Sequence, residues 1–176
     1  PMGGAIFGDT IFACRDPLQP GVLFYTNPGE PDSTKDINQL EICSGSEELM
    51  NGCIFRGHCY VASNEAWYEV VPRFGYGYSI VDNLGAFIAQ DTANKKGLYS
   101  PKAMVVGDKY IYYVSYDGVY RDDGGIAECI STDLHSLFGH DRMDQGLLAY
   151  HIRFDKLNYS LVLVAMYREL AVALFH

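Results

Sequence analysis

The chain of 176 residues lacks features that several large classes of protein need. It has only one tryptophan and no run of Ala, Glu, Lys and Leu long enough for an extended helix. Its 13 Lys and Arg are scattered among 22 Asp and Glu, so the net charge is −9 and no basic cluster stands out. Because nucleic-acid binding requires a positive surface, we expect no direct contact with nucleic acid.

Signals for secretion and membrane insertion are also missing. The first residues, PMGGAIFGDTIF, contain neither a basic segment nor a small-residue cleavage site, so no signal peptide is predicted. The apolar stretch 157–175 is interrupted by polar and charged residues, a pattern that favours paired strands over a membrane span. We therefore expect no membrane span. The interrupting residues are Asn158, Tyr159, Ser160, Arg168 and Glu169.

The cysteines are odd in number and form no CxxC pair. Most have apolar or aromatic neighbours, which predicts free, buried thiols in a reducing compartment. A zinc site is the weaker alternative: His58 and Cys59 are adjacent, and adjacent residues on a strand point to opposite faces. The five cysteines are Cys14, Cys43, Cys53, Cys59 and Cys129.

What the chain has in abundance is glycine, tyrosine and short aromatic segments, a composition that favours β-structure with many turns. Similar segments, in which an apolar strand turns at Gly or Asp into a second strand, are 5–16, 53–64, 104–117 and 151–165. Their turn markers, separated by 49, 50 and 48 residues, are Gly8, Gly57, Gly107 and Asp155. So steady a period indicates a structural repeat.

Each copy has the same predicted plan of strands. A short strand meets a tight two-residue turn, and a longer aromatic strand, a second turn and a third strand follow. In the first three copies the tight turns are predicted at Gly8-Asp9, Arg56-Gly57 and Gly107-Asp108. A looser connection leads to a fourth strand, at 39–44, 77–82 and 126–131 in the first three copies. Gly and Asp tolerate the positive φ angles of two-residue hairpin turns. We therefore predict such a turn at Asp117-Gly118, with a positive φ at Gly118.

Four antiparallel strands repeated every fifty residues or so are typical of β-propeller blades, whereas a β-sandwich has no reason to repeat at one period. We predict an all-β fold in which residues 1–176 form a single propeller region. The expected blades are 3–50, 51–95, 96–146 and 147–176. The fourth reaches only its third strand. We therefore expect it to be incomplete, and the chain to be part of a larger propeller or to receive strands from a partner.

The connections between the expected strands carry the irregular sequence. Residues 27–38 and 85–101 are predicted as loops, and residues 132–146 as a loop with one short helical turn capped by Thr132 or Asp133. Trp67, within EAWYEV, is expected to pack between blades rather than to bind a ligand.

Residue types that often carry chemistry form no recognisable site. The segment SYDGVYRDDGG (115–125) is faintly similar to the Asp-box of sialidase-like propellers, but it lacks the Trp and occurs once, so Asp117 is interpreted as a turn residue. Calcium ligands with a known loop spacing, a histidine paired with a nucleophile, and an esterase-type serine are all missing. No catalytic, cofactor-binding or metal site is predicted. The residues considered were Asp122, Asp123, Asp141, Asp144, His58, His135, His140, His151, His176, Ser44 and Ser46.

Three segments of the sequence resemble segments of a propeller-type family of virion proteins from tailed bacteriophages and prophages. The matching residues are Tyr25 to Asp32, Phe55 to Val71 and Gly97 to Ser131, and the resemblance fades after about residue 140. It implies a non-enzymatic part of the head–tail neck, tail tube or tail hub, with no catalytic residues to carry over. Such a protein is made in the host cytoplasm, is located in the virion and assembles with other virion subunits.

The sequence therefore leaves three hypotheses about function. The first is a virion structural protein that serves as an assembly scaffold and forms an oligomer with its neighbours. The second is a cellular β-propeller that acts as a protein-interaction module. The third is a carbohydrate-active propeller enzyme, which would need acids and arginines gathered at the propeller mouth.

Overall fold

A computed structural model places the backbone of most of the chain. It describes residues 3–7, 9–27, 29–32, 38–73, 87–132, 149–155, 160–167 and 169–175. Side chains are described for residues 9–27, 29–32, 38–73 and 87–132. All elements within these residues are β-strands, and they form four antiparallel sheets of three or four strands, so the all-β prediction is confirmed. The chain divides into two compact units, Pro1–Lys95 and Lys96–His176.

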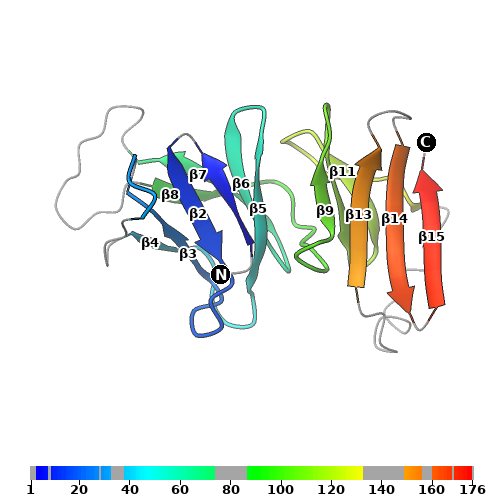
Figure 1. Ribbon diagram of the computed structural model, residues 1–176, viewed down its shortest axis with the longest axis horizontal. Coiled ribbons are helices and arrows are strands. Elements are labelled where there is room, and N and C mark those ends of the chain that lie inside the picture. Colours follow the sequence, from blue (N-terminus) through cyan, green and yellow to red (C-terminus); the bar gives the residue numbers. More distant parts are fainter. Residues whose placement is uncertain are drawn as a thin grey trace. The chain divides into compact units, whose positions relative to one another are not determined.

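The first sheet contains the first four strands in chain order, and they lie side by side in that order (Figure 1). In this sheet Phe7 lies opposite Thr10, and Gly8 of the predicted Gly8-Asp9 turn lies outside the described residues. The strands are β1 (Gly3–Phe7), β2 (Thr10–Cys14), β3 (Val22–Tyr25) and β4 (Gln39–Glu41).

The second sheet repeats this arrangement within the same unit. Its first turn is Arg56-Gly57, because Phe55 lies opposite His58. The two turn residues have φ angles of 49° and 81°, which are the positive values that a type I′ turn requires, and the prediction of a two-residue turn is confirmed. The strands are β5 (Leu49–Phe55), β6 (His58–Ser63), β7 (Trp67–Pro72) and β8 (Phe87–Asp91).

The fourth strand of this sheet differs from the prediction. Residues 77–82 lie outside the described residues, and the strand that pairs with β7 is β8, which the sequence pattern assigned to the connection 85–101. Only Phe87 in β8 is fully buried, and the strand ends in exposed polar residues. Its tertiary contact, rather than a strong local β-pattern, therefore accounts for its position.

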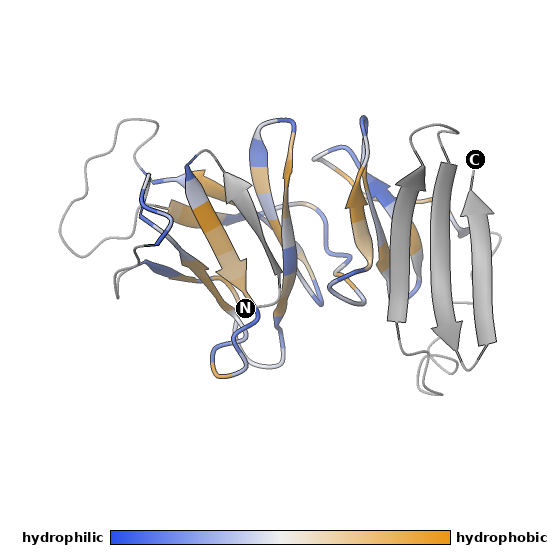
Figure 2. Cartoon of the chain, in the orientation of Figure 1, coloured by the Kyte–Doolittle hydropathy of each residue, from blue (hydrophilic) through white to orange (hydrophobic). Residues whose placement is uncertain are grey.

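The two sheets of the first unit pack face to face through a core of aromatic and aliphatic side chains. Phe87 on β8 lies with its ring centroid 5.0 Å from that of Phe12 on β2 and 5.2 Å from that of Tyr25 on β3. Apolar residues lie mainly along the strands, with hydrophilic turns between them (Figure 2). Burying each large side chain stabilises the fold by about 1.5–3 kcal/mol. Other core members are Cys14, Leu23, Leu49, Cys59, Val61, Tyr68 and Val70.

The second unit contains the third and fourth sheets, again with strands in chain order (Figure 1). The third sheet consists of β9 (Met104–Val106), β10 (Ile111–Ser115), β11 (Gly118–Asp122) and β12 (Glu128–Cys129). The fourth consists of β13 (Ala149–Asp155), β14 (Ser160–Tyr167) and β15 (Glu169–Phe175). The first three strands of the first, third and fourth sheets lie within the expected blades, whereas β5 begins at Leu49, two residues before the expected second blade.

The hairpin between β10 and β11 corrects one prediction. Ser115 lies opposite Gly118, so the two loop residues are Tyr116 and Asp117. Gly118 is the first residue of β11, and its φ angle is not positive. Glycine is needed there for space: an added Cβ would lie 2.7 Å from the Ser131 Oγ and 3.2 Å from the Cys129 Sγ.

The turn before this hairpin is also longer than predicted. Val106 lies opposite Ile111, so four residues, from Gly107 to Tyr110, join β9 to β10 in place of a two-residue Gly107-Asp108 turn. The Gly107 backbone N–H donates to the carbonyl of Tyr110 at 2.9 Å, which closes the longer loop.

The prediction that the cysteines form no disulfide and are mostly buried is confirmed. Four of the five are buried, and Cys129 is half-buried. Burial raises the pKa of Cys14 to about 11 and that of Cys59 to about 12, so these thiols stay protonated and unreactive near neutral pH.

Candidate functional site

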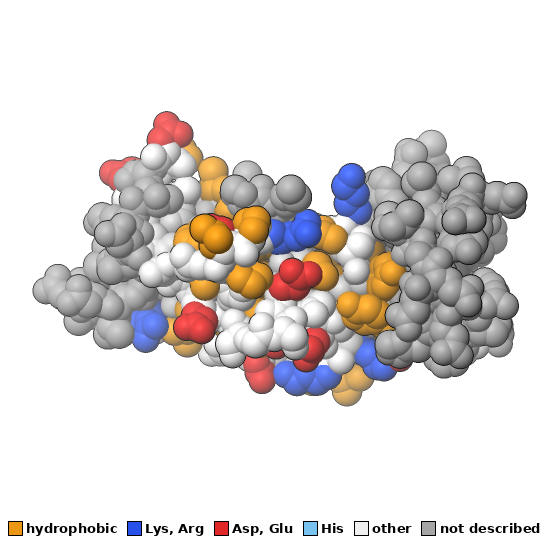
Figure 3. Space-filling model, turned by 90° about the horizontal axis from the view of Figure 1, so that it is seen from below, with side chains coloured by type: hydrophobic (Ala, Val, Ile, Leu, Met, Phe, Trp, Pro, Cys, Tyr) orange, Lys and Arg blue, Asp and Glu red, His pale blue; other side chains and the backbone are white. Residues whose placement is uncertain are grey.

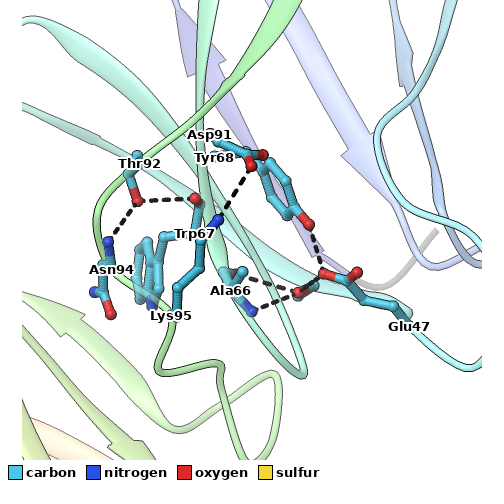
Figure 4. A network of polar contacts seen from close by, with 9 residues as sticks. Glu47, Ala66, Trp67, Tyr68, Asp91, Thr92, Asn94 and Lys95 are labelled. Carbon is cyan, nitrogen blue, oxygen red and sulfur yellow. Dashed lines mark hydrogen bonds and ion pairs between the residues drawn. The ribbon is translucent and has the colours of Figure 1, made fainter.

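One end of the first unit carries a connected group of polar side chains, shown in Figure 4. The Glu47 carboxylate, in the connection between β4 and β5, accepts a hydrogen bond from the Ser63 hydroxyl at the end of β6. The same carboxylate oxygen accepts from the Tyr68 hydroxyl on β7 at 2.6 Å. These bonds join three segments separated by up to 21 residues in sequence.

Ser63 is also the centre of its own hairpin turn. Its buried hydroxyl oxygen accepts hydrogen bonds from the backbone N–H groups of Glu65 and Ala66 at 3.0 and 2.9 Å. A hydroxyl engaged by two backbone donors and one carboxylate has no capacity left for nucleophilic attack. We therefore interpret this serine as a structural residue that shapes the β6–β7 turn.

The electrostatics of this end are set by carboxylates. Burial, and then the charges of four nearby glutamates, raise the pKa of the Cys43 thiol to about 12. Burial and the hydrogen bond to Glu47 also raise the pKa of Tyr68. Both groups are therefore neutral near physiological pH. The glutamates around Cys43 are Glu47, Glu65, Glu41 and Glu48.

Trp67 lies beside this group, and its side chain is buried. Its backbone N–H donates to the carbonyl of Asn94 at 3.1 Å. Its carbonyl accepts from the Thr92 hydroxyl at 2.8 Å, as Figure 4 shows. The burial leaves no exposed indole face for a ligand to stack on. Packing of Trp67 between blades stays a prediction.

A second polar group lies in the second unit, at the β10–β11 turn. The Lys96 ammonium donates to one carboxylate oxygen of Asp117, and the Tyr120 hydroxyl donates to the other at 3.0 Å. The ammonium also lies 5.6 Å from the centroid of the Tyr120 ring. Asp117 is thus a turn residue whose carboxylate fastens the turn to the segment before β9. The interpretation of Asp117 as a turn residue agrees with this geometry.

The other residues considered from the sequence, where the structure describes their side chains, form no common site. The Asp122 carboxylate accepts from the backbone N–H groups of Gly124 and Gly125 at 2.7 and 3.0 Å, which shapes the following turn. His58 pairs with Glu69 at 2.6 Å on the exposed side of β6 and β7. Ser44 and Ser46 are exposed in the turn after β4. Asp141, Asp144, His135, His140 and His176 lie outside the described residues, and His151 lies on β13.

Two further observations concern the described part of the chain. Within it, no three His, Cys, Asp or Glu side chains are placed to hold one metal ion. The same residues include no helix long and apolar enough to cross a membrane.

The chain was also compared with known proteins. No protein-family model matches it, and no curated protein is significantly similar to it.

Sequence reasoning missed the contacts of Glu47 and Lys96. Glu47 lies 16 residues before Ser63, and Lys96 lies 21 residues before Asp117. Because these pairs meet only when the sheets form, no local pattern could have indicated them.

Proposed function

We propose that this chain is a non-enzymatic structural protein of a tailed-phage virion, whose sheets are blades of a β-propeller that acts as an assembly scaffold in the head–tail neck or tail. The observation that carries the proposal is the recurrence of one antiparallel meander every fifty residues or so. Propellers are built from such four-stranded units.

The contacts between corresponding strands support the propeller. In the first unit β1 lies against β5, and β4 lies against β8. In the second unit β9 lies against β13. Equivalent strands of successive sheets thus face one another, as they do when blades are stacked side by side around one axis.

The polar groups support a scaffold rather than an enzyme. The carboxylates of Glu47, Asp117 and Asp122 and the hydroxyl of Ser63 all accept hydrogen bonds that fasten turns. The virion role itself comes from the resemblance of Tyr25–Asp32, Phe55–Val71 and Gly97–Ser131 to phage propeller proteins. The proposed partners are other virion subunits, without direct contact with nucleic acid.

The test is to tag the full-length gene product and to purify particles from cells that produce them. We expect the protein in purified particles at a fixed copy number, and negative-stain images of the isolated protein should show rings with radial blades. Absence from particles, together with a stable complex with a cellular protein, would favour the cellular module. Turnover of a glycoside substrate by the purified protein would favour the enzyme.

A further inference from the structure

The connection between β2 and β3 differs from the corresponding connections in the next two sheets. It contains seven residues, 15–21, whereas the β6–β7 connection contains three, 64–66, and the β10–β11 connection contains two, Tyr116 and Asp117. In repeat proteins, an insertion into one repeat often lies on the binding face, because the other repeats already satisfy the fold. The longer connection is therefore the part of the first unit that the repeat does not explain.

This connection is rigid. The Leu18 backbone N–H donates to the Asp16 carboxylate at 2.9 Å, and the Gln19 N–H donates to the Asp16 carbonyl at 3.1 Å. Pro17 and Pro20 each fix one φ angle on either side of Leu18. A loop held in this way loses little conformational entropy when a partner binds it.

The tip of the rigid loop is apolar and exposed. Leu18 is 89% exposed, more than any other exposed large hydrophobic residue in the described part of the chain, and Pro17 beside it is exposed too. In Figure 2 the loop at the lower left of the first unit is hydrophilic with an apolar tip. Figure 3, seen from this end, shows apolar side chains at the surface of that unit with both acidic and basic side chains nearby.

The loop is joined to the acidic part of the same unit. The Leu49 N–H donates to the Pro20 carbonyl at 2.9 Å, and the Ile42 N–H donates to the Gly21 carbonyl at 3.0 Å. These bonds hold the loop against the β4–β5 connection, around which Glu41, Glu47, Glu48 and Glu65 are gathered. The half-buried Arg15 is the basic residue at the base of the loop.

We propose that Arg15–Gly21 is a docking loop, and that Leu18 inserts into an apolar pocket, rimmed by Lys or Arg, on a different protein. The apolar tip selects the pocket, and the glutamates select a basic rim through charge complementarity. A second copy of this acidic chain would repel the same surface, which disfavours self-association. The inference rests on the proposed function for the identity of the partner, which is then a neighbouring virion subunit.

The experiment places a photo-crosslinking amino acid at position 18 of the full-length protein, and at Ile126 as a control. Ile126 is 80% exposed, but it lies on the β11–β12 connection. We expect one crosslinked product in assembled particles from position 18 and none of that product from position 126. The crosslinked peptide of the partner should contain apolar residues flanked by Lys or Arg. Raising the salt before irradiation from about 0.1 M to about 1 M shortens the Debye length from about 10 Å to about 3 Å. This should lower the yield of crosslinked product, because it weakens the attraction between the glutamates and the basic rim.

A matched pair of variants separates docking from folding. Leu18→Ser and Leu18→Met should both keep the melting temperature of the parent, because the side chain is exposed. Leu18→Ser should lower incorporation into particles by about tenfold or more, as expected for the loss of an apolar anchor, whereas Leu18→Met should keep it. Equal incorporation of both variants would overturn the docking loop.

The remaining outcomes distinguish this proposal from the proposed function. Particles that contain the protein but give no product from position 18 overturn the docking loop and leave the virion role intact. A product formed with a second copy of the chain, or the same product from position 126, also overturns it. If particles lack the protein, the virion role fails. Irradiation in the producing cells then decides: a product with one protein that has the stated pocket supports the loop, and none overturns it.

Discussion

The glycine in the turn at Gly57 differs from the glycines at the strand entries Gly21 and Gly118. Gly57 has a φ of 81°, and an added Cβ would find no heavy atom within 4 Å. Gly21 immediately precedes the third strand of its sheet, and Gly118 begins the third strand of its own; neither has a positive φ. An added Cβ would clash with residues in or just after the fourth strand of the same sheet. The first glycine is required by the backbone conformation and the other two by lack of space.

This difference explains why the sequence alone misplaced one turn. Asp-Gly is a strong hairpin signal because glycine adopts positive φ without strain. The Asp117-Gly118 pair predicted a turn one residue too late in the chain. Gly118 is instead required by the close approach of Cys129 and Ser131, which depends on the fourth strand and has no local signal. Substitutions at the three glycines test the distinction, from the largest expected effect to the smallest.

Gly21→Ala should be the most harmful substitution. The new Cβ would lie 1.9 Å from the backbone oxygen of Cys43 and 2.8 Å from its carbonyl carbon, so the backbone after β4 has to move. We expect a loss of about 3 kcal/mol or more, at the upper end of overpacking effects. Chemical denaturation of the purified protein measures this loss, and a melting curve that overlies that of the parent would contradict the assigned cause.

Gly118→Ala should have a smaller effect, because the atoms it meets belong to side chains. The closest is the Ser131 Oγ, which also accepts a hydrogen bond from the Val119 N–H at 2.8 Å. We expect a loss of about 1–3 kcal/mol. The double variant Gly118→Ala, Ser131→Gly should lose less stability than the two single variants lose in total, because the serine that clashes is gone. If the losses are simply additive in this double-mutant cycle, the clash is not with Ser131.

The first three strands of each sheet could be predicted from the sequence because alternating apolar residues and tight turns are local signals. The fourth strands could not be placed as well. β4 and β12 contain three and two residues, and β8 depends on the contact of Phe87 with two rings from another sheet. The seven-residue connection 15–21 was equally hidden, because RDPLQPG indicates a turn but not that it presents a rigid, exposed leucine.

Gly57→Ala should cost about 1–2 kcal/mol, the usual penalty for placing a residue with a Cβ in the left-handed region. Because the space around Gly57 is open, the cost should depend on backbone conformation alone. Gly57→Asn should therefore be better tolerated than Gly57→Ala, since asparagine visits this region more readily. Melting temperatures of the two variants check this order, and the reverse order would indicate a steric contact instead.

Asp117→Asn should have the smallest effect on stability, and that effect should depend on pH. Burial alone would raise the pKa of Asp117, but hydrogen bonds from Lys96 and Tyr120 outweigh burial and lower the pKa below the ordinary value of 3.8. A carboxyl group with a lowered folded-state pKa stabilises the fold above its unfolded pKa, and this stabilisation disappears as the pH falls through the folded pKa.

The side chains of Lys96 and Asp117 are 46% and 38% exposed, so solvent screening keeps the contribution below about 1 kcal/mol. Near pH 7 the parent should melt slightly above the Asn variant, and the two melting curves should converge as the pH falls below about 4. Since asparagine can still accept from Tyr120 and suits the turn, the fold should be unchanged and particle assembly should be retained. Loss of assembly by a variant with a near-parental melting temperature would instead make Asp117 a functional contact rather than a turn residue.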